Sequence, residues 1–377
     1  MALADFDIPR FLDQYWQQRP LVLKQLIPDF EDLIDEHDLA GIAQENDADS
    51  RIVSRNSKGE WLSTNGPFVN FDSVCVDKWS LLVRGVERYI DSVDDLFEHF
   101  AFIPYWRMDD VMVSYSIEGA GVGAHIDQYD VFLIQGKGQR RWQIGAPGDY
   151  QEVDQGGLRQ INHFVPSIDV VTKAGDVIYI PPGWPHKGET IEDGLTYSIG
   201  YRSPDTDQLV NTMHELLETS PNTSKRFNDP MREPTSLPAI VTAKDIMQLK
   251  QMLRELLDHP AIDEQLLSML SDCHVHHADE AQPIDLEELE FALLANQRMI
   301  RLEGIRPLYA EHQSNPAEFT FHINGELFTC EANLRDWLEP LLNKRVHVIP
   351  ITVDTPIKPL CQVLIELISR GYYFIDE

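Results

Sequence analysis

The chain has 377 residues, of which 43% are hydrophobic, 25% are charged and 9% are aromatic. These values are typical of a folded, soluble protein of two or three domains, and they exclude a fibrous or largely disordered chain. The 31 basic and 62 acidic residues give a formal net charge of −31. That charge disfavours non-specific binding to nucleic acid or anionic lipid and favours a basic partner, although a surface that only keeps the protein soluble would explain it too.

The N-terminus and the cysteines predict a cytoplasmic protein. Asp5 and Asp7 stand where a secretory signal peptide would carry basic residues, and no apolar core follows them. No run approaches the roughly 18 apolar residues of a membrane span. The cysteines lie too far apart for a zinc ribbon or a redox motif, so we expect reduced thiols. They are Cys75, Cys273, Cys330 and Cys361.

The first 205 residues are expected to form a mainly β domain. Apolar residues from Phe11 to Trp16 recur at helical spacing, and Arg19-Pro20 then opens an extended run from Leu21 to Leu23. Between residues 109 and 201, short runs rich in Val, Ile, Tyr and Phe alternate with Gly, Pro or Asp turns. So many strands at close spacing predict a sandwich or a barrel. The runs are VMVSYS, DVFLIQ, RRWQIG, DVIYIP and LTYSIGY.

The remaining residues divide into a helical part and an α+β part. Residues 206–280 contain two amphipathic helical patterns, one from Leu209 to Leu217 and one from Ile246 to Leu257. Residues 281–377 contain further helix and the alternating run Phe319–Ile323, which is followed by the hairpin signal Asn324-Gly325. The sequence therefore predicts domains at 1–205, 206–280 and 281–377.

Two short motifs predict a metal site. His125 and Asp127 are two residues apart, so on an extended strand both side chains point to the same face. His186 ends the run IPPGWPH, in which rigid turn residues would hold it at the mouth of another strand. Two histidines and one carboxylate on one side of Fe(II) leave positions free for a chelating cosubstrate and dioxygen. An isolated His-x-Asp is common by chance, and only its combination with the second motif supports a site.

A cosubstrate such as 2-oxoglutarate would bring a second carboxylate, which needs a fixed cation when it is buried. Arg140 is the candidate, because strand alternation places it on the face of Trp142, whereas Arg141 would face solvent. Hydroxyl groups on neighbouring predicted strands could complete the hydrogen bonds of the cosubstrate, although each also fits an ordinary strand residue. They belong to Ser116, Thr196 and Ser198.

Together these motifs resemble the JmjC ribosomal oxygenases, and within them the bacterial arginine hydroxylases of large-subunit ribosomal protein sixteen. The resemblance covers nearly the whole chain and places the metal and cosubstrate residues on His125, Asp127, His186 and Arg140. It is carried by FLDQYWQQRPLVLK, WSLLV, HIDQYDVFLIQGKGQRRW, GDVIYIPPGWPH and GYYFIDE.

The resemblance implies a double-stranded β-helix of the cupin/JmjC type, then a helical dimerisation region and a small winged-helix-like domain. It also implies Fe(II), with 2-oxoglutarate and O2 as cosubstrates. In the implied reaction, 2-oxoglutarate is decarboxylated to succinate and carbon dioxide, and the β-carbon of an arginine in a 50S ribosomal protein is hydroxylated. The expected partners are therefore a basic ribosomal protein and a second copy of the chain.

We expect the substrate arginine to enter beside Glu118 and Ser203, whose oxygens can accept hydrogen bonds from a guanidinium. A solvated turn residue and the first residue of a linker are the respective alternatives. Two other signals are set aside. Cys273–His277 lacks a second cluster at zinc-finger spacing, and Gly119–Gly123 does not fit the dinucleotide fingerprint and is read as a flexible approach to the metal site.

Three functions compete with arginine hydroxylation. A JmjC enzyme could instead hydroxylate a histidine in another ribosomal protein. A cupin-like binding protein could retain a vestigial site, but the complete triad and Arg140 disfavour this. A regulator could bind DNA through the winged-helix-like tail, but the charge of −31 disfavours direct binding to nucleic acid.

Overall fold

The computed structural model describes residues 3–219, 225–230, 232–234, 236–273, 275, 284–313 and 315–376. The chain divides into two compact units, Met1–Ser203 and Pro204–Glu377. The predicted further division between residues 280 and 281 lies outside the described residues. Within the described residues, no helix is both long enough and apolar enough to cross a membrane.

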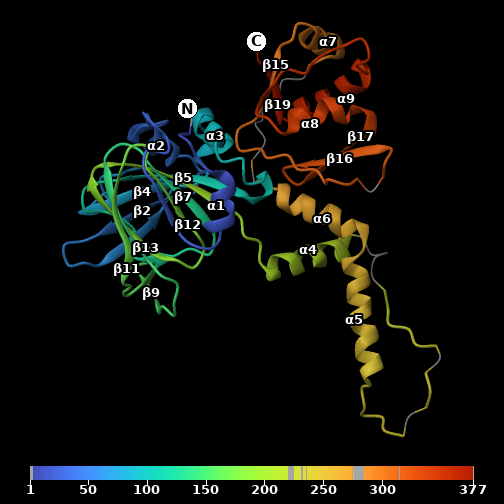
Figure 1. The fold of residues 1–377 in the computed structure, drawn as a ribbon, viewed down its shortest axis with the longest axis horizontal. Coiled ribbons are helices and arrows are strands. Elements are labelled where there is room, and N and C mark those ends of the chain that lie inside the picture. The colour runs from blue at the N-terminus through green and yellow to red at the C-terminus, as the bar shows by residue number, and fades with distance from the viewer. Residues whose placement is uncertain are drawn as a thin grey trace. The chain divides into compact units, whose positions relative to one another are not determined.

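The first unit is built on two antiparallel sheets and a hairpin (Figure 1). The large sheet has the strand order β1 (Leu21–Leu23), β12 (Val177–Ile180), β7 (Asp130–Gln135), β14 (Gly194–Tyr201), β5 (Met108–Ser116), β4 (Lys78–Val83), β2 (Ser50–Arg55) and β3 (Trp61–Asn65). The small sheet has the order β11 (Pro166–Lys173), β8 (Gln139–Gly145), β13 (Pro185–Glu192) and β6 (His125–Ile126). The hairpin pairs β9 (Glu152–Gln155) with β10 (Leu158–Ile161).

Helices cover the outer face of the large sheet (Figure 1). They are α1 (Ile8–Gln14), α2 (Glu36–Ile42) and α3 (Asp91–Glu98), with the short 3-10 turns η1 (Val86–Arg88) and η2 (Tyr105–Arg107). Phe11 of α1 is buried against the rings of Phe132 and Tyr179, with centroids 5.5 Å and 4.9 Å away. The sequence predicted this helix from Phe11 to Trp16. In the structure it begins at Ile8 and ends at Gln14, and the chain then turns at Gln17, which has a positive φ of 56°.

Strand alternation divides the large sheet into an apolar face and a polar face. On β14, the side chains of Leu195, Tyr197, Ile199 and Tyr201 belong to the apolar core beneath the helices. The intervening Thr196, Ser198 and Gly200 line a cavity on the other side of the sheet. All eight residues of β14 are buried, so the polar residues among them identify the functional face of the sheet.

The second unit contains helices and short strands around its own apolar core. Its elements are α4 (Thr206–Thr219), α5 (Ala243–Leu257), α6 (Pro260–Ser271), α7 (Leu286–Leu294), β15 (Arg298–Arg301), β16 (Glu318–Ile323), β17 (Glu326–Glu331), η4 (Ala332–Leu334), α8 (Arg335–Leu342), β18 (Val346–His347), α9 (Ile357–Ser369) and β19 (Tyr373–Asp376). The predicted hairpin is present, since β16 and β17 pair across Asn324 and Gly325, both with positive φ.

Helix α5 differs from the other helices of this unit because it buries none of its side chains. A capping box between Thr242 and Asp245 fixes its first turn. Five of its apolar residues are between 44% and 61% exposed, which leaves an apolar face along the helix that no described residue covers. These residues are Ile246, Met247, Leu249, Leu253 and Leu257.

Candidate metal and cosubstrate site

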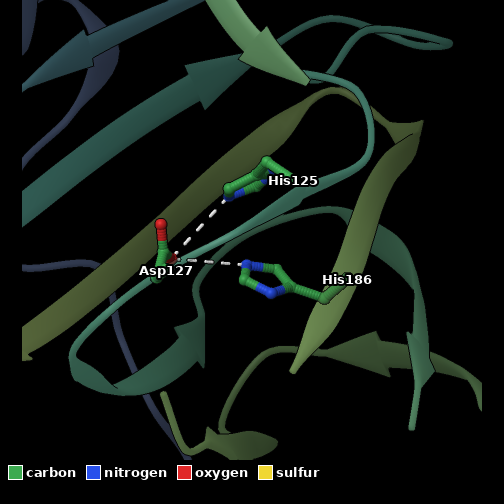
Figure 2. A group of neighbouring side chains, drawn as sticks. All are labelled: His125, Asp127 and His186. Carbon is green, nitrogen blue, oxygen red and sulfur yellow. Dashed lines mark ion pairs between the residues drawn. The ribbon is translucent and has the colours of Figure 1, made fainter. Parts of the chain in front are cut away.

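The two sequence motifs come together in the small sheet. His125 lies on β6 and is paired directly with His186 on the adjacent strand β13. Asp127 follows β6, and its Oδ2 lies 3.8 Å from Nε2 of His125 and 3.5 Å from Nε2 of His186. Figure 2 shows both Nε2 atoms directed toward this carboxylate. The three ligand atoms lie within 4.8 Å of one another, and no other such cluster of potential metal ligands occurs among the described residues.

Both imidazole rings are oriented in the same way. The Nδ1 of His125 lies 3.2 Å from the carbonyl oxygen of Gly123, and the Nδ1 of His186 lies 3.0 Å from that of Trp184. A carbonyl can only accept, so Nδ1 carries the proton and the Nε2 lone pair is free to bind a metal. Burial, reinforced by the neighbouring His125, lowers the pKa of His186 to about 4 and keeps its ring neutral.

A cavity of about 550 Å³ opens beside the triad. The inward residues of the strands form its walls, and the alternation on β5 places Asp110, Met112, Ser114 and Ser116 along one side. Ser116 and Asp110 are six residues apart, so the cavity extends roughly 20 Å along this strand. Val131, Leu133 and Trp142 supply an apolar wall.

Arg140 lies at the inner end of this cavity and is 5% exposed. Its Nη1 lies 3.4 Å from the hydroxyl of Ser116, and its guanidinium stacks over the ring of Trp142 at 5.0 Å. Among the described residues, it forms no ion pair and its Nε has no hydrogen-bond partner. Burial therefore lowers the pKa of Arg140 to about 10. A buried cation without a carboxylate is costly, so this end of the cavity fits an anionic ligand.

Arg141 contrasts with Arg140, as strand alternation predicted. Its side chain is half exposed and pairs with Asp169 of β11, with Nη2 2.6 Å from Oδ2. It is therefore already neutralised on the outer surface of the small sheet. The three predicted hydroxyl residues, Ser116, Thr196 and Ser198, all line the cavity.

Glu118 and Ser203 do not line the cavity, which differs from our expectation for the substrate-binding residues. Both side chains are exposed. Strand β5 ends at Ser116, so its alternation does not continue to Glu118, whose peptide N–H instead donates to Asp193. Ser203 likewise follows the end of β14 at Tyr201. The structure therefore separates both residues from the cavity that contains the triad.

The sequence interpretation missed the polar residues at the outer end of the cavity. Asp110 is only 8% exposed, and its Oδ2 accepts a hydrogen bond from Nε of Arg84 at 2.7 Å. The ring of Tyr129 and the carboxylate of Asp49 also line this end. Asp110 has the same strand parity as Ser116, and this alternation was the signal that could have found it.

The glycine-rich segment before His125 is held by hydrogen bonds on both sides, which does not support the expected flexible approach. Gly119 and Ala120 form two backbone hydrogen bonds with Thr190 of β13, and the N–H of Ile161 donates to the carbonyl of Ala124 at 2.8 Å. In the rejected zinc cluster, Cys273 is a free, buried thiol. The three histidines of that cluster lie outside the described residues.

The triad and Arg140 fit one group of cofactors. Two neutral imidazoles and a carboxylate on one side of a metal are typical of non-haem Fe(II) oxygenases. The unpaired Arg140 and the nearby hydroxyl groups match the distal carboxylate of 2-oxoglutarate. The backbones of His186 and Arg140 lie on adjacent strands, because His186 pairs with Ile144, four residues along β8 from Arg140. The metal ligands and the cation therefore line the same cavity.

Comparison with known proteins agrees with this geometry. Residues 95–209 match the family model of the JmjC domain. The ribosomal protein uL16 3-hydroxylase of Escherichia coli is 37% identical, and the alignment covers 98% of this chain and 97% of the relative. A probable ribosomal oxygenase of Haemophilus influenzae is 32% identical, with 90% and 86% covered.

Solved structures extend the likeness to the whole fold. The X-ray structure of Escherichia coli YcfD superimposes with a TM-score of 0.91 at 32% identity, and both chains are fully covered. YcfD, described as a ribosomal oxygenase, has also been solved in complex with cobalt and 2-oxoglutarate, and that structure gives a TM-score of 0.88 at 32% identity, with 100% of this chain and 99% of that chain covered. The first unit therefore has the β-rich, cupin-like JmjC fold, and the chain belongs to the JmjC-domain ribosomal oxygenases.

Proposed function

We propose that this chain is an Fe(II)- and 2-oxoglutarate-dependent dioxygenase that hydroxylates the β-carbon of an arginine in a large-subunit ribosomal protein. One observation carries the proposal: a single cavity contains a His-Asp-His triad, an unpaired buried arginine at one end and a buried carboxylate at the other. The uL16 3-hydroxylase and the cobalt and 2-oxoglutarate complex of YcfD support the same reaction, since position 3 of an amino acid is its β-carbon.

In this reaction the residues of the site would have different roles. His125, Asp127 and His186 would hold Fe(II) from one side, so that the cosubstrate and O2 can bind on the other. Fe(II), when bound with 2-oxoglutarate and O2, supplies the oxidative chemistry. Arg140 would neutralise the distal carboxylate of 2-oxoglutarate.

The hydroxyl groups at the inner end of the cavity would orient the same carboxylate by donating hydrogen bonds. The apolar wall formed by Val131, Leu133 and Trp142 would keep water from the reacting atoms. The three hydroxyl groups belong to Ser116, Thr196 and Ser198.

The outer end of the cavity is suited to a guanidinium. Asp110 presents a buried carboxylate there, of which Arg84 engages Oδ2. Its Oδ1 faces Gly200, where even a Cβ would approach to 3.1 Å, so glycine keeps this oxygen accessible. We assign the substrate guanidinium to Asp110 and not to Glu118 or Ser203. An arginine anchored at its far end would turn its β-carbon back toward the triad.

We also propose how the other parts of the chain contribute. The exposed apolar face of α5 supports a dimerisation role for residues 206–280, because a second copy would cover it. Residues 281–377 are assigned to a winged-helix-like domain that does not bind nucleic acid directly, consistent with the charge of −31. The cytoplasm is the proposed location, because ribosomal proteins are synthesised there.

Mass spectrometry of reacted peptides tests the proposal. The protein, loaded with Fe(II), is incubated with 2-oxoglutarate and a loop peptide of uL16 that contains arginine, and with twins that carry lysine or histidine instead. We expect the mass of one oxygen atom to appear on the arginine peptide together with one succinate per turnover. Lysine should react poorly because it lacks the planar guanidinium fork.

The same peptides discriminate between the candidate functions. Preferred oxidation of the histidine twin would replace arginine by histidine as the target. No oxidation of any peptide, and no mass difference between ribosomal proteins from cells with and without the protein, would support a non-catalytic binding protein instead. Retardation of random duplex DNA at low salt would support the DNA-binding regulator.

A further inference from the structure

The two metal-binding histidines are supported unequally by the fold. His186 lies on the eight-residue strand β13 and is 2% exposed. His125 lies on β6, which has only two residues, and its side chain is 23% exposed. Strand pairing therefore fixes His186 well but leaves His125 dependent on the glycine-rich segment that precedes it.

A side chain from the β9–β10 hairpin holds this segment. Gln160 on β10 is 4% exposed, and its Nε2 donates to the carbonyl of Val122 at 2.8 Å. The amide of Gln160 also lies against the backbone of Gly123, whose φ is +82°. A Cβ at Gly123 would lie 2.3 Å from the Nε2 of Gln160, so only glycine allows both this backbone conformation and this close approach.

The contact continues directly to the metal ligand. The carbonyl of Gly123 accepts from Nδ1 of His125 at 3.2 Å, and this bond sets both the tautomer and the direction of the ring. We propose that Gln160 is a positioning residue for the metal ligand His125, acting through the Val122–Gly123 peptide. The hydrogen bonding around His186 is different: its Nδ1 faces the carbonyl of Trp184 within the loop that leads into its own strand.

The hairpin itself does not depend on Gln160, which allows the positioning role to be separated from folding. Leu158 of β10 is 6% exposed and packs in an apolar cluster with Val53 and Leu82. The peptide N–H of Ile161 holds Ala124 independently of any side chain. Replacing the Gln160 amide by a thioether of similar length should therefore remove the hydrogen bond to Val122 and leave the hairpin docked.

The test compares Gln160→Met with Gln155→Met in the full-length protein, using Co(II) as the metal probe. Gln155 lies on β9 of the same hairpin and, among the described residues, has no hydrogen bond to the segment before His125. Visible absorption during titration with Co(II) reports both affinity and ligand geometry, and thermal unfolding without metal reports the fold. We expect Gln160→Met to bind Co(II) about tenfold more weakly with a changed spectrum, while both variants melt as the wild type does.

The inference rests on the proposed metal site but not on the proposed substrate. Unchanged Co(II) affinity and spectrum in Gln160→Met would overturn the positioning role while leaving the oxygenase intact. Equal weakening in both variants, accompanied by equal destabilisation, would overturn it in favour of a purely structural hairpin. Asp127→Ala serves as the control for the metal site. If it bound Co(II) as the wild type does, or if the wild type bound none, the metal site and the proposed function would both be wrong.

Discussion

The two ends of the cavity differ in the burial and the ion pairing of their arginines. At the inner end, Arg140 is 5% exposed and, within the described residues, has no carboxylate partner. At the outer end, the side chain of Arg84 is 50% exposed and contacts three carboxylates, those of Asp49, Asp109 and Asp110. The inner end is thus incomplete without a ligand that carries negative charge, whereas the arginine of the outer end is already paired and carboxylates are in excess there.

This difference distinguishes a cosubstrate site from a substrate site. A buried, unpaired cation raises the free energy of the free protein, and an anionic cosubstrate relieves that cost when it binds. A carboxylate that is already paired, such as Asp110, relieves less electrostatic free energy when a ligand binds. It therefore contributes more to selecting the substrate than to affinity. Four predictions test this comparison.

The largest loss of activity should come from a substitution in the triad. Asp127→Ala removes the carboxylate that faces both imidazoles, and we expect turnover to fall to the uncatalysed background. The barrel should remain folded, because its core lies on the other face of the large sheet. Succinate formation and thermal unfolding measure the two outcomes, and turnover at the wild-type rate would contradict the iron assignment.

Arg140→Met should separate cosubstrate binding from folding. Loss of the charge-assisted partner should weaken 2-oxoglutarate by roughly 2 to 5 kcal/mol, while Co(II) binding survives. The ligand-free protein should become more stable, because a buried charge without an ion pair has been removed. Affinity is measured by titration and stability by denaturant unfolding, with Arg141→Met as the exposed control. An unchanged affinity for 2-oxoglutarate would move this role away from Arg140.

Asp110→Asn should affect the peptide substrate alone. A guanidinium that loses a charged acceptor should bind more weakly by roughly 1.5 to 3 kcal/mol, seen as a raised KM for the arginine peptide. The KM for 2-oxoglutarate should not change, because Asp110 and Ser116 lie at opposite ends of β5. The control is Asp109→Asn, which removes the neighbouring carboxylate that also contacts Arg84. Equal effects of both variants would indicate a general loss of charge at the mouth.

Much of the first unit could be predicted from the sequence because its signals are local. The spacing of His125 and Asp127 and the rigid run before His186 both depend on neighbours along the chain, and the triad forms as predicted. Strand parity correctly separated Arg140 from Arg141. The hairpin at Asn324 and Gly325 was likewise encoded by two adjacent residues.

The parts that could not be predicted depend on contacts between distant residues or on where a strand ends. Glu118 has the parity of Ser116, but β5 stops at Ser116, and no local signal marks that end strongly enough. Gln160 lies 38 residues from Val122, so its hydrogen bond appears only when the hairpin is docked. Strand parity could have placed Asp110 on the face of Ser116, but its hydrogen bond with Arg84, 26 residues away, appears only in the folded sheet.

The smallest effect on catalysis should come from Glu87, which lies beneath the outer end. Its side chain is 2% exposed, and its Oε2 accepts from the peptide N–H of Val111, the residue after Asp110. Burial, with a further contribution from the charge of Asp110, raises the pKa of Glu87 to about 8 from its usual 4.5. The folded protein therefore retains a proton that the unfolded chain releases. This carboxyl costs no stability below about pH 4.5, and stability is lost as the pH rises from there toward 8.

Glu87→Gln keeps an oxygen for Val111 but cannot ionise, so the variant should unfold like the wild type at pH 4 and be more stable at pH 8. We expect a gain of several kcal/mol at pH 8, because each unit by which the pKa is raised from 4.5 toward about 8 corresponds to about 1.4 kcal/mol. Denaturant unfolding across this pH range measures the difference, and Glu31→Gln, at an exposed position, is the control. Peptide turnover should stay unchanged, since Oδ2 of Asp110 is held by Arg84 and, within the described part of the chain, not by Glu87. A gain that is the same at every pH would show that Glu87 is not buried as a neutral acid, and the outer end would then depend on a fourth ionised carboxylate.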